Sequence, residues 1–337
     1  MALLDINDLT IEYKLSDGKV RAVDDVTLKV ENGDVLGLVG ESGCGKTTLI
    51  KAVMGLLAKN GKAVSGQIMY KEKDLLKLNK NQIRKVRWND ISMITQSAMN
   101  SLNPVYRVGW QINEAILEHT NFSKEQANEK SKSLFDLVGL ERDRLEDYPH
   151  QYSGGMKQRA IIAMSLALDP NIIIADEPTT ALDVIVQSQI LERINKLLDG
   201  YDGSMILVTH DISAVAQTCN KIAVMYGGKI MEYGDIRQVL KQPNHPYTMG
   251  LKNAFPSITG EKKELVSIKG VPPDLSKEIR GCRFKDRCPF VIKKCIEIEP
   301  EKVKTEKGFF RCSRYEEIDK IREMSDDMET WNNCNGE

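Results

Sequence analysis

Apolar and polar positions at the start of the chain follow the patterns of an α/β fold. Residues 2–13 alternate apolar and polar side chains, as a half-buried β-strand does. Two further apolar runs, Val26 to Val30 and Val35 to Val39, predict a second and a third strand. A glycine-rich loop follows, and Thr47 to Leu57 predicts a helix. A strand, a loop and a helix in this order indicate the opening of a parallel α/β core.

Helical and strand patterns alternate through the middle of the chain. Between about residues 109 and 145, apolar residues recur at helical spacing among many charges, and a further helix is predicted from Gly154 to Leu168. The apolar run Ile172 to Ala175 predicts a buried parallel strand, and Ser204 to Thr209 predicts another. The patterns weaken towards residue 245, which marks a boundary. The middle of the chain therefore continues the α/β core.

Composition and charge narrow the class of protein. The chain has 337 residues, and its 47 Lys and Arg against 48 Asp and Glu leave a net charge of −1, so it lacks the basic footprint of a nucleic-acid-binding protein. The start MALLDINDLTIEY lacks the features of a signal peptide. No apolar run reaches the roughly 18 residues of a membrane-spanning helix. We therefore expect a cytoplasmic protein that takes any membrane role through a partner.

A glycine-rich motif follows the third predicted strand. Its sequence, Gly40-Glu41-Ser42-Gly43-Cys44-Gly45-Lys46-Thr47, matches the P-loop pattern, in which backbone N–H groups and a helix start bind phosphate. Lys46 would reach the β- and γ-phosphates, and Thr47 would ligate Mg²⁺. The alternative is an ordinary glycine-rich turn. The residues expected to hold the nucleotide phosphates are Gly40, Ser42, Gly43, Cys44, Gly45, Lys46, Thr47 and Thr48.

Two acidic residues follow the buried strand at 172–175. A P-loop enzyme needs a second oxygen ligand for Mg²⁺, and Asp176 stands where that ligand is expected. Glu177 comes directly after it. Two adjacent unpaired carboxylates are costly in a core, so we assign Asp176 to Mg²⁺ and Glu177 to the general base that activates water. The alternative is a solvated pair at the end of a strand.

A second candidate anion site opens the helix predicted from residue 154. Ser153-Gly154-Gly155-Met156-Lys157-Gln158-Arg159 places small residues at a helix start, which favours anion binding. Because one P-loop already serves one nucleotide, Ser153 and Gly155 would face the γ-phosphate of an ATP held by a second subunit. The alternative is an ordinary N-cap.

These motifs, in this order and at this spacing, resemble those of the ABC ATPase family over about residues 3–255. Two departures occur in the signature, where Tyr152 replaces the usual Leu and Met156 the usual Gln, while Ser153 and Gly155 are intact. The matching segments are the P-loop, Gln96 of the Q-loop, Tyr152–Met156, Asp176-Glu177, Thr180-Ala181-Leu182-Asp183 of the D-loop, and Thr209-His210-Asp211 with the switch histidine.

The resemblance implies a fold and several residue roles. The fold is an α/β P-loop ABC ATPase core over residues 1–255, with a RecA-like mixed sheet, an antiparallel β subdomain and a helical subdomain at about 97–165. In it, Tyr13 would stack on adenine, although a tyrosine of the core is the alternative. Gln96 would touch Mg²⁺ or the attacking water, and His210 would hold the γ-phosphate. Asp183 would link the two active sites of the dimer.

Shorter segments resemble the oligopeptide and dipeptide importers among ABC proteins. They are Ser101–Gly109, Pro149-His150 and Asn244–Thr248. This resemblance implies an ATPase bound at the cytoplasmic face of the membrane. Its partners would be a second, different ATPase subunit, two integral permease subunits and, indirectly, an extracytoplasmic substrate-binding protein. Importers of nickel or glutathione share parts of the pattern, and a non-transport ABC ATPase acting on nucleic acid is the more distant alternative.

A C-terminal extension, residues 256–337, carries a cluster of cysteines. In a cytosolic chain the spacing of Cys282, Cys288, Cys295 and Cys312 suggests a metal before a disulfide. The gaps are wider than in most zinc sites and suit a 4Fe–4S cluster, which the resemblance also implies; zinc and incidental thiols or disulfides are the alternatives. Residues 282–314 hold ten Lys and Arg against five Asp and Glu. We expect a folding or regulatory role without a part in ATP hydrolysis, and a frayed acidic tail from Glu316.

Overall fold

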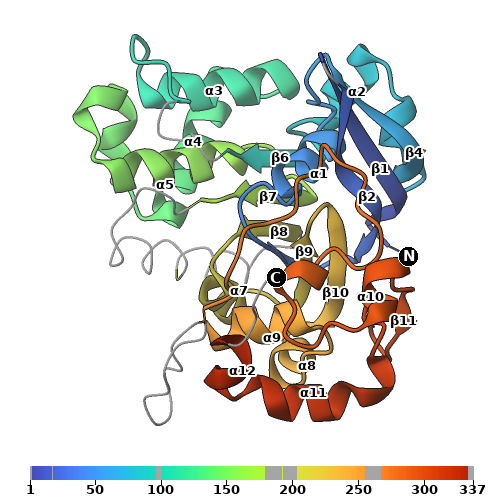
Figure 1. The fold of residues 1–337 in the computed structure, drawn as a ribbon. Coiled ribbons are helices and arrows are strands. Elements are labelled where there is room, and N and C mark those ends of the chain that lie inside the picture. Colours follow the sequence, from blue (N-terminus) through green and yellow to red (C-terminus); the bar gives the residue numbers. More distant parts are fainter. Residues whose placement is uncertain are drawn as a thin grey trace. The chain divides into compact units, whose positions relative to one another are not determined.

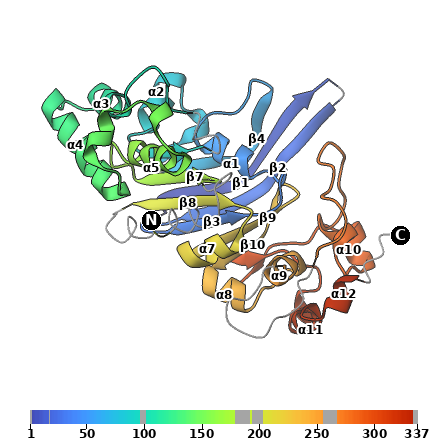
Figure 2. The same ribbon diagram turned by 90° about the vertical axis from the view of Figure 1, so that its left-hand side faces the viewer.

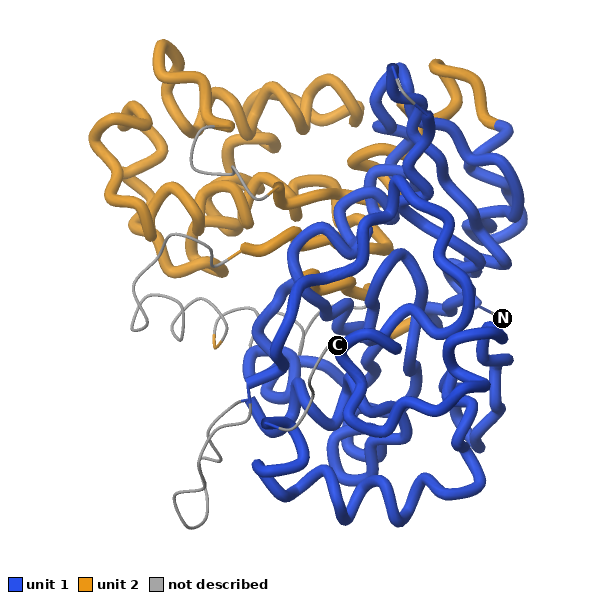
Figure 3. Tube along the Cα trace, viewed as in Figure 1, with its two compact units in different colours: residues 1–31, 35–77, 209–337 blue, residues 32–34, 78–208 orange. Residues whose placement is uncertain are grey.

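The chain folds into two compact units. The computed structural model describes residues 2–16, 18–95, 101–178, 192, 203–254 and 267–332. Unit 1 comprises residues 1–31, 35–77 and 209–337, and unit 2 comprises residues 32–34 and 78–208 (Figure 3). The P-loop and the cysteine-bearing segment thus belong to the same unit.

An antiparallel sheet forms the start of unit 1. It contains β1 (Leu4–Leu15), β2 (Gly18–Val30), β4 (Gly61–Tyr70) and β5 (Lys73–Asp74), in the order β2-β1-β4-β5, followed by the 3₁₀ turn η1 (Leu75–Lys77) (Figure 1). The predicted strand at residues 2–13 is confirmed. The second strand begins at Gly18 and not at Val26, because the polar half of β2 pairs with the end of β1, as Leu15 does with Gly18. Pairing with a neighbouring strand can extend a strand through residues whose pattern does not predict it.

A second group of strands carries the P-loop. In unit 1, β3 (Val35–Val39) pairs in parallel with β9 (Lys221–Tyr226), which pairs antiparallel with β10 (Lys229–Asp235). Helices α1 (Lys46–Val53) and α7 (Ile212–Thr218) belong to the same unit. Helix α1 ends four residues before the predicted Leu57, because the chain turns at Gly55, where φ is +60°. The strand–loop–helix opening of the core is confirmed.

Unit 2 contains parallel strands and a group of helices. Strand β7 (Ile172–Asp176) pairs in parallel with β6 (Ile91–Ile94) and with β8 (Ser204–Thr209). All five residues of β7 are buried, which confirms the predicted buried strand and extends it to Asp176. The helical elements in the described part of unit 2 are α2 (Lys80–Val86), α3 (Val108–His119), α4 (Lys124–Val138), η3 (Arg142–Glu146), η4 (Pro149–Gln151) and α5 (Gly154–Ser165). The helix predicted over 154–168 thus ends at Ser165.

The C-terminal segment is helical and ordered well beyond Glu316. In unit 1 it forms α8 (Ile236–Lys241), α9 (Pro246–Asn253), η5 (Lys285–Arg287), α10 (Lys293–Glu297), η6 (Tyr315–Glu317), α11 (Ile318–Ser325) and α12 (Met328–Asn332). Helices α9, α11 and α12 lie side by side (Figures 1 and 2). Trp331 is 1% exposed, and its indole N–H donates to the Ser325 carbonyl. The expectation of a frayed tail is therefore wrong up to residue 332, because a buried aromatic anchors the last helix.

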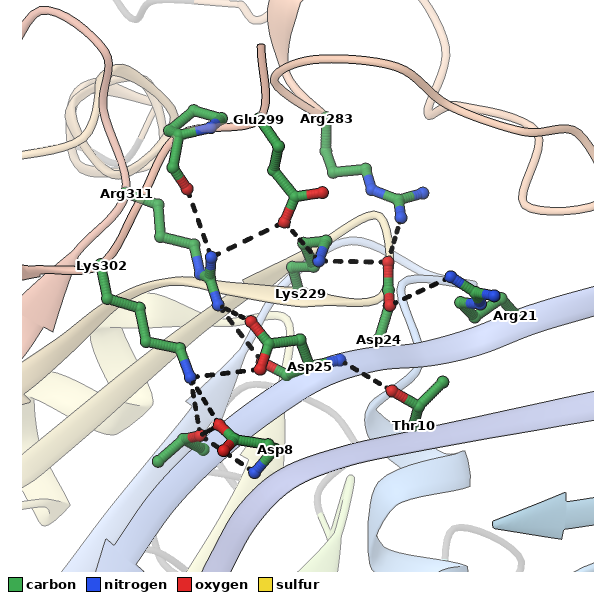
Figure 4. A network of polar contacts seen from close by, with 12 residues as sticks. Asp8, Thr10, Arg21, Asp24, Asp25, Lys229, Arg283, Glu299, Lys302 and Arg311 are labelled. Carbon is green, nitrogen blue, oxygen red and sulfur yellow. Dashed lines mark hydrogen bonds and ion pairs between the residues drawn. The ribbon is translucent and has the colours of Figure 1, made fainter. Parts of the chain in front are cut away.

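A network of charges, with buried cations and carboxylates that range from buried to exposed, links the C-terminal segment to β2 (Figure 4). Lys229 lies 3.1 Å from Asp24 and 2.6 Å from Glu299, and Arg283 also pairs with Asp24. Arg311 pairs with Asp25. The strands β11 (Val303–Lys304) and β12 (Phe309–Phe310) extend the sheet of unit 1 beside β10. Buried ion pairs of this kind leave a costly lone charge when one partner is removed.

The predicted division into residues 1–255 and 256–337 stays a prediction. Its boundary lies in residues 255–266, outside the described part of the chain. Of the helices that the structure describes, none combines the length and the apolar character that crossing a membrane requires.

Candidate functional site

The P-loop connects β3 to α1 in unit 1, and its backbone geometry demands glycine. Gly45, the N-cap of α1, has φ +108°, and a Cβ atom there would lie 2.2 Å from the Ala22 carbonyl oxygen. A Cβ on Gly40 would lie 2.1 Å from the Met225 carbonyl oxygen. No side chain caps the helix at Gly45. A glycine-rich turn that leads into an uncapped helix start is the arrangement that binds phosphate through the main chain.

Lys46 is folded over this loop. Its side chain is buried, and Nζ donates to the carbonyl oxygens of Gly40 at 2.7 Å and Glu41 at 3.0 Å. The Cys44 thiol, 3.8 Å from Nζ, is buried, and burial raises its pKa. Cys44 therefore remains a neutral thiol. Its amide donates to the Glu41 carbonyl at 3.3 Å, and its carbonyl accepts from the Gly228 amide at 3.0 Å. The predicted phosphate residues Ser42 and Gly43 are exposed, whereas Thr47 and Thr48 are half-buried on the first turn of α1.

Tyr13 lies on β1 of the same unit and is half-buried. Its ring packs against β4, where a Cβ atom on Gly61 would lie 2.5 Å from the Tyr13 Cε1 atom. The absence of a side chain at Gly61 therefore leaves room for the Tyr13 ring. Stacking of this ring on adenine stays a prediction.

His210 lies in the short connection between β8 and α7. The His210 side chain is exposed. Its neighbour Asp211 is the N-cap of α7, and the Asp211 carboxylate accepts hydrogen bonds from the amides of Ser213 and Ala214. A strand end followed by a tightly capped helix fixes the backbone that carries His210.

Asp176 ends β7 in unit 2, and Glu177 follows it directly. Asp176 is 4% exposed, and its register partner on β8 is Val208. Glu177 is half-buried, and its amide donates to the Val208 carbonyl at 2.8 Å. Its φ of +49° is unusual for a residue with a side chain and costs about 1–2 kcal/mol. Strain of this kind gathers at functional sites, where the surrounding structure holds it in place.

Ser153 is the N-cap of α5 in unit 2, so the alternative interpretation of this motif describes its local structure correctly. Its exposed hydroxyl accepts a hydrogen bond from the Met156 amide at 3.3 Å. Tyr152, one of the departures from the family signature, is buried, and its hydroxyl donates to the Arg144 carbonyl at 2.6 Å. Tyrosine in place of the usual leucine is therefore accommodated among the helical elements of unit 2. Ser153 and Gly155 remain at the helix start, and their contact with a nucleotide stays a prediction.

The predicted nucleotide residues divide between the units. Unit 1 holds Tyr13, the P-loop and His210, while unit 2 holds Ser153, Gly155, Asp176 and Glu177. Gln96 and Asp183 lie outside the described residues.

The four C-terminal cysteines line one pocket in unit 1. Its lining includes Cys282, Cys288, Cys295 and Cys312, together with aromatic residues and His245. All four are free thiols. The Cys282 amide donates to the Cys295 carbonyl at 2.7 Å, which closes the segment into a loop. Burial raises the pKa of Cys282 to about 12 and that of Cys312 to about 11.

Four cysteines in one pocket are residues of the type that binds a metal through thiolates. Their thiols, however, are not arranged as a metal site. Over the described ranges, no group of three or more His, Cys, Asp or Glu side chains is arranged to hold a metal ion. What the structure adds to the sequence is the convergence of the four thiols on a single pocket.

Sequence reasoning missed a contact between this segment and the P-loop. Arg287 pairs with the carboxylate of Glu41 at 2.8 Å, and the Tyr247 hydroxyl accepts a hydrogen bond from the Glu41 amide at 3.1 Å. The excess of basic residues at 282–314 was the available signal, but it does not identify which residue is paired with which.

Comparison with known proteins places the chain in a family. A model described as "ABC transporter" matches residues 23–180, and one described as "Oligopeptide/dipeptide transporter, C-terminal region" matches residues 231–295. The oligopeptide transport ATP-binding protein OppD of Escherichia coli K12 is 44% identical over 301 residues, covering 89% of each chain. The dipeptide transport ATP-binding protein DppD of Bacillus subtilis 168 is 44% identical, covering 88% of this chain and 90% of its own.

A solved structure agrees with this placement. The ATP-binding cassette MJ0796, in a dimeric post-hydrolysis state bound to ADP and phosphate, superposes with a TM-score of 0.62 at 25% identity. The match covers 69% of this chain and 99% of the cassette. The P-loop geometry, the length of the matches and the shared C-terminal region lead to one conclusion: the chain belongs to the ATP-binding subunits of ABC transporters, in the oligopeptide/dipeptide branch.

Proposed function

We propose that the chain hydrolyses ATP to drive uptake of dipeptides and oligopeptides through a membrane importer. The observation that carries this proposal is the 44% identity to peptide-transporter ATPases over nearly the whole chain, extending into the C-terminal region. The chain is an ABC ATPase, so its own contribution is nucleotide chemistry. The substrate is handled by its partners.

The roles in ATP hydrolysis follow from the chemistry of each residue. Lys46 exchanges its bonds to the Gly40 and Glu41 carbonyls for phosphate oxygens, and Thr47 and Asp176 supply oxygen ligands for Mg²⁺. Glu177 takes a proton from the attacking water. His210 and Gln96 orient the γ-phosphate and the water.

The second half of the site comes from another subunit. We infer that Ser153 and Gly155 of one subunit contact the ATP held by the P-loop of its partner, with Asp183 linking the two sites. The exposed position of Ser153 at a helix start supports this inference. The partner ATPase is a different chain, and two permease subunits hold the pair at the cytoplasmic face of the membrane. A substrate-binding protein on the other side delivers the peptide.

We also infer that Cys282, Cys288, Cys295 and Cys312 hold a 4Fe–4S cluster. Their spacing and their common pocket support the inference, since cysteine thiolates are the ligands of such clusters. When bound, the cluster supplies covalent cross-links between four points of the segment. Phe284 and Phe290, which also line the pocket, would shield a bound cluster from water. Zinc is the alternative occupant.

Peptide-dependent ATP hydrolysis tests the proposed substrate. The chain, co-expressed with candidate permease and ATPase partners and reconstituted in liposomes, should hydrolyse ATP faster when the binding protein carries a dipeptide or oligopeptide. Nickel and glutathione are the matched competitors. Stimulation by nickel or glutathione alone would contradict the peptide assignment while leaving the ATPase assignment intact.

A further inference from the structure

Residue Glu41 of the P-loop is bonded through its side chain, its amide and its carbonyl. Arg287 Nη1 donates to both carboxylate oxygens of Glu41, at 3.0 and 2.8 Å. The Glu41 amide donates to the Tyr247 hydroxyl at 3.1 Å, and its carbonyl accepts from Lys46 Nζ at 3.0 Å. Tyr247 and Arg287 lie some 200 or more residues further along the chain. The local motif alone does not hold this loop in place.

Arg287 is itself fixed by its surroundings. Its side chain is 6% exposed. Nε donates to the Lys269 carbonyl at 2.9 Å, and Nη2 donates to the Ile268 carbonyl at 3.0 Å. Nη1 also lies 3.1 Å from the Tyr226 hydroxyl. A guanidinium whose three nitrogens all donate hydrogen bonds is pre-organised, so little entropy is lost when it binds the carboxylate.

The carboxylate of Glu41 presents an electrostatic problem to a phosphate-binding loop. Glu41 is the second residue of the P-loop, and its side chain is 26% exposed. A negative charge in this position repels the triphosphate, and the repulsion is strong where water is partly excluded. A paired cation cancels most of that field. Arg287 is the residue that supplies the cation here.

We propose that Arg287 is a positioning residue for the nucleotide site, which neutralises Glu41 and holds the P-loop against the C-terminal segment. The proposal rests on the assignment of the P-loop to ATP. Arg287 does not touch the nucleotide itself; it acts through Glu41. The C-terminal segment is thereby part of the nucleotide site, in contrast to the sequence-based expectation that it plays no part in ATP hydrolysis.

The same contacts connect the P-loop to the cysteine pocket. Arg287 directly precedes Cys288. Phe284, which lines the pocket, packs with ring centroids 5.3 Å from both Tyr226 and Tyr247. Both tyrosines belong to the group that holds Arg287 or Glu41. A change in the pocket therefore reaches the P-loop through directly packed side chains.

The test measures affinity for a slowly hydrolysed ATP analogue by calorimetry, using the full chain. Arg287→Met should weaken binding roughly tenfold, equivalent to about 1.4 kcal/mol. Glu41→Gln added to that variant should restore affinity to near the wild-type value, since it removes the unpaired charge. The defect of Arg287→Met should also shrink at high salt, because added ions screen a partly exposed carboxylate. A purely structural role for Arg287 predicts neither the rescue nor the salt dependence.

Arg311→Met is the matched control. Arg311 is equally buried, directly precedes Cys312 and pairs with a carboxylate, but that carboxylate is Asp25 on β2. This variant should keep wild-type affinity for the analogue. Equal losses in both variants, or a rescue that fails, would overturn the proposal.

Two further variants keep the test decisive if Arg287→Met does not fold. Glu41→Gln alone removes the negative charge but keeps a side-chain oxygen that accepts from Arg287, so the loop stays held and the variant should bind the analogue at least as well as the wild type. Weaker binding would also overturn the proposal. Lys46→Ala examines the P-loop assignment separately. If Lys46→Ala binds the analogue normally, the assignment of the nucleotide site fails, whatever the result for Arg287.

Discussion

The P-loop and the cysteine pocket lie in the same unit but depend on different parts of the chain. In the P-loop the binding groups are main-chain amides, and the fold secures them by excluding side chains at Gly40 and Gly45. In the cysteine pocket the proposed binding groups are thiols, which come from four points of a looped segment and line one pocket. A buried cysteine occurs in both regions, yet Cys44 has no predicted role for its thiol. The same residue type should therefore be replaceable in one region and essential in the other.

The largest effect is expected on the rate of ATP hydrolysis when the side chain of Glu177 is changed. ATP binding, which depends on main-chain groups of the P-loop, should be unaffected. Glu177→Gln removes the general base and keeps the shape of the strand end, so turnover should fall by ~10²-fold or more. ATP binding should persist, because the P-loop is unchanged. ATPase rates and gel filtration check this prediction, and the variant should accumulate as an ATP-bound dimer. Hydrolysis at a near-normal rate would remove Glu177 from its assigned role.

Replacement of the signature serine tests whether the second anion site serves a partner's nucleotide. Ser153→Arg places a long side chain at the start of α5 and should lower ATPase activity by more than about tenfold, since the γ-phosphate contact is lost. The affinity of the isolated subunit for ATP should remain nearly unchanged. Titration of monomeric protein with a nucleotide checks this expectation. A large loss of affinity there would instead put Ser153 in the subunit's own pocket.

Loss of a thiol from the cysteine pocket tests the second of the two regions. Protein purified without oxygen should be brown and contain about four irons per chain, and Cys295→Ser should lose the colour and lower the melting temperature. ATP binding should survive, with any loss no greater than that of Arg287→Met. Iron analysis and visible absorption provide the measurement. Colourless protein with one zinc per chain would contradict the cluster.

The smallest effect is expected at the cysteine of the P-loop. Cys44→Ala removes a buried neutral thiol without touching the main chain, so stability should fall by about 1 kcal/mol or less. ATP affinity should stay close to the wild-type value. Thermal melts and the same nucleotide titration detect the difference. Abolished binding would show that the side chain, and not the backbone alone, forms this part of the loop.

Local motifs predicted which segments form strands and where the P-loop lies, and distant pairing explains what they missed. Strand β7 with Asp176 and the P-loop with α1 follow from short stretches of sequence, because an apolar run and a glycine pattern determine them locally. The early start of β2 at Gly18 depends on pairing with β1. The ordered tail depends on the burial of Trp331 beside Ser325.

The bond between Arg287 and Glu41 is the clearest example of information that a local pattern does not contain. The two residues are 246 positions apart. Glu41 belongs to the P-loop motif and Arg287 to the cysteine-bearing segment, and neither pattern indicates a contact with the other. A charge count over residues 282–314 indicates an excess of cations but not their partners. The chemistry of the P-loop could be predicted, whereas the residue that balances its charge required the fold.

Peptide uptake by the reconstituted transporter is the most direct test of the account. Liposomes that contain the chain, its partner ATPase and the permease subunits should accumulate a labelled oligopeptide when ATP and the binding protein are supplied. Uptake and hydrolysis should both be lost in Lys46→Ala, since the phosphate-binding loop then lacks its cation. Uptake that continues in Lys46→Ala, or ATP hydrolysis that never responds to peptide, would contradict the account.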